Sequence, residues 1–215
     1  MQYHYEATSE FINSISEAKT LTTLAASDDE NRILFLKLSV VSMVTKFQVF
    51  IEKVLDEFRY SINGIQSGKL PLYMRMNAIR LSVLDGNALL SIKNNKDFSE
   101  EKKAKIVRYL NSISFIANDA KEIEESFMFK TKFPLGKTGK SELVDLFSQI
   151  DGDQAPFGSF DKDDFNKLDS VLQTRHLIIH QDRFIGTETT VKGSIDFLTN
   201  LVEYIDGYLF SKVPK

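Results

Sequence analysis

Residues 33 to 62 form one long apolar-periodic segment, which limits the possible folds more than any other feature of the chain. The segment contains no proline or glycine, and apolar side chains recur every three or four residues. This spacing gathers them on one side of a helix rather than on alternate sides of a strand. The expected inward side carries Leu36, Val40, Val44, Phe47, Ile51, Val54 and Phe58, widened by Leu34, Leu38, Val41 and Phe50. The sequence therefore predicts a central helix, capped by Ser27 and stopped at Asn63 and Gly64.

The rest of the chain repeats the helical pattern. Four prolines and ten glycines are few punctuation points for 215 residues, and no segment shows sustained alternation. Further helices are expected at 5–25, at 71–93 with Gly86 as a bend, at 99–127 with a break near Asn118, after Ser141, at 161–180 and at 189–210. The third helix should turn Ile79, Val83, Leu89 and Leu90 inward. We predict an all-α bundle forming one domain over residues 1–215.

Composition excludes several classes of protein. The chain has no cysteine, so thiol catalysis, cysteine-ligated zinc and iron–sulfur clusters are excluded. Its formal charge is −3 and its pI is about 5.7, so a polyanion would need a local basic site. Lys37 and Lys46 interrupt the most apolar stretch, which favours a buried helix over a membrane span. Residues 1–6 lack the pattern of a signal peptide, and we expect a cytoplasmic protein with no membrane partner.

Two motifs resemble ligand sites but lack required residues. The run from Gly136 to Ser141 is similar to the end of a P-loop, yet Pro134 stands where the first glycine belongs. A basic turn with Ser141 as a helix cap is the better interpretation. Asp151 and Asp153 suggest a calcium loop, but Ala155 and Pro156 replace a ligand and the required glycine. No other cluster has metal-ligand spacing, so we expect neither a metal nor a cofactor.

A basic loop separates the expected fourth and fifth helices. Between residues 127 and 141 it contains four lysines and no acid: Lys130, Lys132, Lys137 and Lys140. Such a loop is typical of a surface that binds a polyanion or an acidic protein.

The strongest candidate for chemistry lies near the end of the 161–180 helix. Arg175, His176 and His180 occur there, and the chain has only three histidines. Arg175 falls within the expected apolar side made by Phe165, Leu168, Val171, Leu172, Ile178 and Ile179. A guanidinium in that position is costly unless a carboxylate, carbonyl or phosphate lies opposite it. On a neighbouring side, Asp169, Gln173, His176 and His180 form a polar stripe.

Arg175 and His180 point in different directions on an ideal helix. Five positions at 100° per residue separate them by about 140°. Either the helix ends before His180 and the chain turns that side chain back, or a second copy completes the site across a two-fold axis. A purely structural role, with Arg175 in an ion pair and both histidines at an exposed helix end, is the competing interpretation.

The motif resembles a known family. Arg175-His176-x-x-x-His180, at the end of a penultimate helix and followed by a turn and an amphipathic last helix, is similar to the R-polar-x-x-x-H signature of the HEPN superfamily. The run at 165–174 resembles the family's apolar-periodic lead into the motif, and the motif-bearing pair of helices spans about 161–210. The long N-terminal helices are compatible with the larger bacterial ribonuclease and toxin branch.

The resemblance implies an all-α HEPN-like domain that dimerises with its two motifs facing one cleft. It implies a metal-independent endoribonuclease in a toxin–antitoxin, antiviral or stress-response system, with RNA as substrate and an antitoxin or other defence protein as a possible partner. Carried onto this chain, His180 would be the acid/base group, Arg175 would hold the scissile phosphate and His176 would assist. The four loop lysines would contact substrate. The alternative is a catalytically silent HEPN-like binding or adaptor protein.

Overall fold

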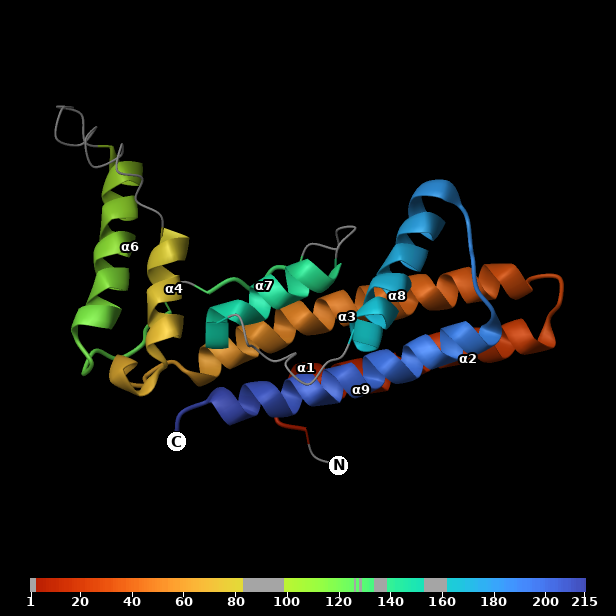
Figure 1. Ribbon diagram of the computed structural model, residues 1–215, viewed down its shortest axis with the longest axis horizontal. Helices are drawn as coiled ribbons and strands as arrows, with labels where there is room; N and C mark the ends of the chain where they lie inside the picture. Colours follow the sequence, from red (N-terminus) through yellow and green to blue (C-terminus); the bar gives the residue numbers. More distant parts are fainter. Residues whose placement is uncertain (1–2, 83–98, 126, 128, 134–138, 153–161) are drawn as a thin grey trace.

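The computed structural model describes residues 3–82, 99–125, 127, 129–133, 139–152 and 162–215, and its elements are helices joined by turns (Figure 1). Among the described residues the only extended pairing is one isolated bridge between Gln66 and Glu122. The predicted all-α fold class is therefore confirmed. Val83, Gly86, Leu89, Leu90 and Asp161, which the sequence placed in or at the ends of helices, lie outside the described residues.

The central helix is α3 (Arg32–Ser61), which runs along the length of the molecule (Figure 1). Its main predicted side and Phe50 are buried, while Val41 is partly buried. Leu34 and Leu38 were wrongly predicted to face inward, because α1, α2, α8 and α9 pack on other sides of α3. α3 has the length and composition of a membrane span, as no other helix in the described ranges does, but its main apolar side forms the core.

The start of α3 differs from the prediction. Ser27 is the last residue of α2 and its hydroxyl donates to the Leu24 carbonyl, so it does not cap α3. The Asp28 carboxylate instead accepts the Asn31 amide at 3.0 Å. This short-range hydrogen bond stabilises a turn over 28–31 and delays the helix to Arg32.

Three helices cover the core side of α3: α1 (Glu6–Ser14), α2 (Ser16–Ser27) and α9 (Glu188–Lys212) (Figure 1). The expected single helix at 5–25 is divided at Ile15, whose buried side chain lies at the junction. α9 begins at a capping box in which Thr187 and Thr190 bond each other's backbone amides.

A pair of helices projects from the C-terminal end of α3 (Figure 1). After the short η1 turn (Ser67–Lys69) come α4 (Leu72–Ser82) and α6 (Glu100–Ala117), which pack on each other. We call the described residues 67–82 and 99–117 the arm. The break near Asn118 is confirmed, but the predicted extension toward Phe127 is wrong. Residues after 118 return to 64–68, where the Gly68 amide bonds the Asp119 carbonyl at 2.9 Å.

Two further helices complete the described structure. α7 (Gly139–Asp151) lies between α4 and α8 and begins before Ser141, so Ser141 is not its cap. α8 (Lys162–Gln181) packs on α3 and its C-terminal end projects outward (Figure 1). This projecting end carries the predicted motif.

Candidate functional site

α8 holds the motif on a helix anchored by apolar side chains. Leu168, Val171, Leu172 and Ile178 are buried, as expected, and Phe165 is partly buried. Ile179 was expected to face inward but is 49% exposed. Near the motif, the buried side of α8 is therefore narrower than predicted, and Ile179 lies in solvent beside His180.

The helix does not end before His180. It continues through Gln181, and only then does Asp182 adopt a left-handed conformation with φ of 52°. Asp is among the few residues besides glycine that tolerate this region. The Asp182 amide still bonds the Ile178 carbonyl at 3.1 Å. The alternative in which the chain turns His180 back toward Arg175 is therefore wrong, and the two side chains keep their separate directions.

Lys37 fixes the turn that follows the motif. Its ammonium donates to the Asp182 carbonyl at 2.8 Å and to the Asp182 carboxylate at 2.6 Å. Because Lys37 belongs to α3, this contact fastens the end of α8 to the central helix. The sequence analysis treated Lys37 only as an interruption in an apolar stretch, and nothing in the local pattern identified its partner 145 residues away.

The structure brings the two motif histidines together. His176 and His180 have ring centroids 4.4 Å apart with planes inclined by 47°. His176 is half-buried and His180 is exposed. A spacing of four residues places both on one side of α8, with Gln173 exposed one turn earlier. The pair offers a solvent-facing imidazole supported by a second imidazole.

Arg175 lies on a different side of α8 and is half-buried. Its Nε is inaccessible to solvent, and among the described residues Nε has no hydrogen-bond partner and the guanidinium forms no ion pair. The acid that the structural interpretation required opposite Arg175 is therefore absent from the described part of the chain. A buried donor without an acceptor costs free energy, and the terminal guanidinium nitrogens are left to bind a phosphate or another anion.

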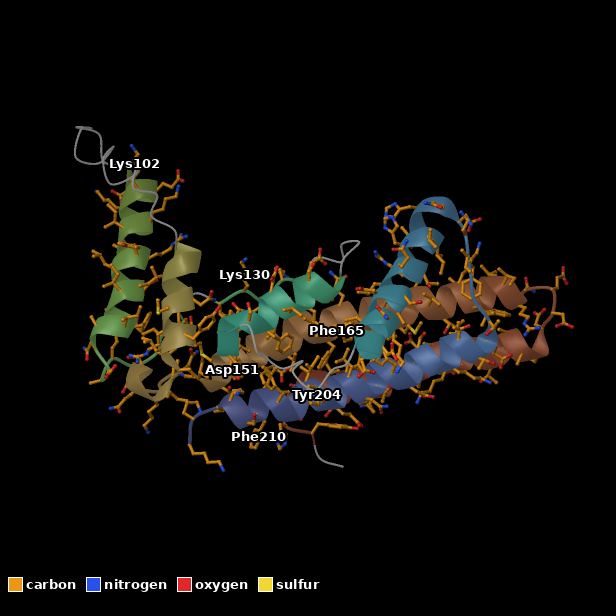
Figure 2. The ribbon with its side chains drawn as sticks, in the orientation of Figure 1. Lys102, Lys130, Asp151, Phe165, Tyr204 and Phe210 are labelled. Carbon is orange, nitrogen blue, oxygen red and sulfur yellow. The ribbon has the colours of Figure 1, made fainter. Side chains whose placement is uncertain are left out.

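The two described loop lysines, Lys130 and Lys132, lie away from the motif end of α8. Lys130 is exposed beside α7, and the projecting C-terminal end of α8 lies apart from it (Figure 2). Its backbone is held by Gln149, whose side chain bonds the Lys130 amide at 2.8 Å and carbonyl at 2.7 Å. Lys132 forms an ion pair with Glu52 at 2.9 Å. Lys137 and the side chain of Lys140 lie outside the described part of the structure.

Lys130 and Lys132 border a groove of about 720 Å³ between α3, α7 and the 129–133 segment. Acidic side chains also line it, namely Glu52, Glu142 and Asp145. Burial opposes ionisation of Glu52, but hydrogen bonds from Lys132, the Phe133 amide and Gln48 hold its pKa below the usual range. The groove is thus of mixed charge. Within the described ranges, no group of three or more His, Asp or Glu side chains has the arrangement of a metal site.

A family model described as RiboL-PSP-HEPN matches residues 5–210. The chain belongs to this HEPN family. The match runs from the start of α1 into α9 and includes α8 with its motif, which confirms the resemblance drawn from Arg175, His176 and His180. HEPN domains are generally associated with ribonuclease activity. No curated protein and no solved structure matches the chain.

Proposed function

We propose that this HEPN protein is a metal-independent endoribonuclease that cleaves RNA by attack of the 2′-hydroxyl on the adjacent phosphate. The observation that carries the proposal is the state of Arg175. Its half-buried guanidinium lacks an anion among the described residues and lies in the same two helical turns as His176 and His180, whose rings are in contact. A phosphodiester supplies the missing anion, and the histidines supply proton transfer.

The chemistry needs no group beyond those in the motif. One imidazole removes the proton of the 2′-hydroxyl as the 2′-oxygen forms a bond to phosphorus. The bond from phosphorus to the 5′-oxygen breaks, and that oxygen receives a proton from the imidazolium that has formed. Arg175 stabilises the negative charge on the phosphorane. The products are a 2′,3′-cyclic phosphate and a 5′-hydroxyl, and no water enters this step. His180 is the exposed acid/base group, and His176 orients it.

We place the complete site between two copies of the chain. In one copy, α8 is continuous through Gln181, so Arg175 and His180 diverge by about 140°. Ile179 lies exposed beside His180, and Leu34 and Leu38 are exposed on α3 within one turn of Lys37, which contacts Asp182 after the motif. Exposed apolar side chains next to the motif are suited to a homodimer interface. Lys130, Lys132, Lys137 and Lys140 are proposed to contact the RNA backbone outside this site.

The biological setting is proposed from the family alone. A small nuclease with a site exposed on a helix end needs control, so we assign it to a toxin–antitoxin, antiviral or stress-response system in the cytoplasm. An antitoxin or another defence protein would then cover the motif end of α8.

The first test is cleavage of a single-stranded RNA in EDTA, with the ends identified by mass spectrometry. Cleavage should persist, and a 2′-deoxy substitution should protect its own linkage. His180→Ala should lose about 10²- to 10⁴-fold in rate, the usual contribution of general acid–base catalysis. His4→Ala is the matched control because His4, the third histidine, stacks on Phe210 away from the motif. Circular dichroism and thermal melting confirm that each variant is folded.

The second test distinguishes a shared site from a site within one chain. Arg175→Ala and His180→Ala are each inactive alone and are then mixed after partial unfolding and refolding. In a mixed dimer, one of the two composite sites takes both intact residues, so activity should return to about a quarter of wild type. No recovery from folded, dimeric mixtures would contradict the shared site.

Two results would overturn the nuclease. Activity that is lost in EDTA and restored by magnesium would contradict the metal-independent step. Equal cutting by folded His180→Ala and wild type would remove His180 from the chemistry. If no RNA is cut and the motif variants retain partner binding, the protein is the catalytically silent adaptor.

A further inference from the structure

The arm differs in charge from the chain that carries it. Its described residues, 67–82 and 99–117, include seven Lys and Arg but only two Asp and Glu, a formal charge of +5. The whole chain has a formal charge of −3. Positive charge is therefore concentrated at the end of α3 opposite the motif, although the motif provides no reason for it.

Several arm cations have no ion-pair partner in the described part of the chain. The two acids at the start of α6 form ion pairs with two lysines: Lys103–Glu100 at 2.6 Å and Lys105–Glu101 at 2.8 Å. A further three cations of the arm form no ion pair with any described residue: Lys69, Lys102 and Arg108. Lys69 and Arg108 are exposed, and Lys102 is half-exposed near the tip of α6 (Figure 2). Unpaired, solvated cations are available to an anionic ligand.

The arm is held firmly at its base. The amide of Gly68 bonds the Asp119 carbonyl at 2.9 Å, and a side chain at position 68 would place its Cβ 2.7 Å from the Asp119 Cβ, so only glycine fits. Arg75 on α4 donates to the Asp119 carboxylate at 2.5 Å. The Ser67 hydroxyl bonds the Asn118 carbonyl at 2.8 Å. These contacts join both helices to one turn and keep the unpaired cations in a fixed arrangement.

We propose that the arm is a second RNA-binding surface, which holds the backbone of the substrate strand at a distance from the cleavage site. The inference rests on the proposed function for the choice of RNA as the polyanion. Lys69, Lys102 and Arg108 contact phosphates, and their field attracts the strand. Exposed Val107 and Leu110 lie among these cations and provide apolar contact for unstacked bases.

The amphipathic pattern of α6 favours RNA over a lipid surface. Phe115 is buried and Ile106 and Ile113 are half-buried, so the apolar side of α6 is already used within the fold. A helix that lies in a membrane interface needs that side free. The exposed side carries charges with isolated apolar residues between them, which suits a backbone-tracking surface.

The distance between the arm and the motif predicts how substrate length matters. Lys37 contacts the turn after the motif, and Ser61 ends α3 at the base of the arm. Twenty-four residues at 1.5 Å each place these points about 36 Å apart. At 3.4 Å per stacked nucleotide, a strand needs about ten nucleotides to reach from one to the other. The arm should therefore strengthen the binding of long RNA and leave short RNA unaffected.

The test compares Lys102→Glu/Arg108→Glu with Lys19→Glu/Lys192→Glu, which changes net charge equally on the α2–α9 surface. Binding is measured by fluorescence anisotropy in the His180→Ala background, with RNAs of about six and about thirty nucleotides over a range of salt. The arm variant should bind the long RNA at least about tenfold more weakly. Its plot of log affinity against log salt should be shallower by about 1.4, because two phosphate contacts are lost. The control should change binding by less than about twofold, and the short RNA should not distinguish the variants.

The milder Lys102→Gln/Arg108→Gln, checked by thermal melting, covers the case in which charge reversal disturbs α6. Equal binding of long RNA by the arm variant and the control would overturn the proposal. If the arm variant loses only its binding to anionic vesicles, the arm binds a lipid surface. If only its sedimentation changes, the arm binds a second copy. Either result would overturn the proposal. Cleavage of the short RNA tests the nuclease separately, because that substrate does not reach the arm.

Discussion

Two charged side chains, Asp206 and Arg175, differ in how far the described part of the fold supplies them with hydrogen-bond partners. At the junction of α1 and α9, the buried Asp206 carboxylate accepts three hydrogen bonds, from the amides of His4 and Tyr5 at 3.1 Å and from the Thr8 hydroxyl at 2.7 Å. On α8, the half-buried Arg175 has an Nε with no acceptor among the described residues. A charge that the fold satisfies internally stabilises the fold, whereas a charge left without a counterpart is available to a ligand.

The largest expected effect on stability comes from removing the Asp206 carboxylate. Asp206→Ala would leave the buried Tyr5 amide and Thr8 hydroxyl without an acceptor, each costing about 1–3 kcal/mol, and would also remove the acceptor of the part-buried His4 amide. We expect the free energy of unfolding to fall by about 3 kcal/mol or more, measured by urea denaturation followed by circular dichroism. Cleavage per folded molecule should be unchanged at low temperature. A loss below about 1 kcal/mol would show that Asp206 does not hold α1 in place.

Removing the charge of Arg175 should have the opposite outcome, with stability kept and RNA cleavage lost. Arg175→Met keeps most of the side-chain volume and removes a cation that has no ion-pair partner among the described residues. The free energy of unfolding should stay within about 1 kcal/mol of wild type and shift toward stabilisation, because an unpaired half-buried charge is lost. RNA cleavage should be abolished. A large loss of stability would mean that Arg175 is structural, and the contrast with Asp206 would fail.

The sequence revealed most of the fold because its core depends on local spacing. The inward side of α3 and the motif in α8 follow from apolar periodicity and a short signature, and both were predicted. Leu34, Leu38 and Ile179 were not, since their exposure depends on where neighbouring helices end. The Lys37–Asp182 contact and the three bonds to Asp206 join residues over 140 positions apart. No single-sequence pattern marks such contacts.

A smaller effect on stability is expected at Asp182, which follows α8. Asp182 adopts a left-handed conformation and accepts two bonds from Lys37. Asp182→Ala should lower the free energy of unfolding by about 1 kcal/mol, because alanine is strained in this region. Asp182→Gly removes the strain along with the carboxylate, so its stability should lie closer to wild type. If alanine and glycine were equally stable in urea denaturation, the backbone conformation would not contribute.

Two carboxylates on α3, Glu57 and Glu52, should make stability depend on pH in opposite directions. Burial raises the pKa of Glu57, although the amides of Ala7 and Glu6 donate to it. Its ionised form is therefore disfavoured by folding, and its contribution to stability is lost as pH rises through the folded pKa. For Glu52, hydrogen bonds outweigh burial and lower the pKa from 4.5. Its contribution is present above pH 4.5 and is lost as pH falls through the folded pKa.

The smallest effect follows from the Glu52–Lys132 pair, whose lysine is 85% exposed. Lys132→Met should reduce the free energy of unfolding slightly at neutral pH, because exposed ion pairs contribute little. The difference from wild type should shrink below pH 4.5 as Glu52 becomes protonated in the folded protein. Lys130→Met is the control, since Lys130 has no ion-pair partner in the described ranges and should give a pH-independent difference. Urea denaturation of all three proteins across this range provides the measurement. A Lys132→Met difference that stayed constant or grew in acid would mean that Glu52 is not stabilised by this lysine, and Lys132 would then be as available to RNA as Lys130.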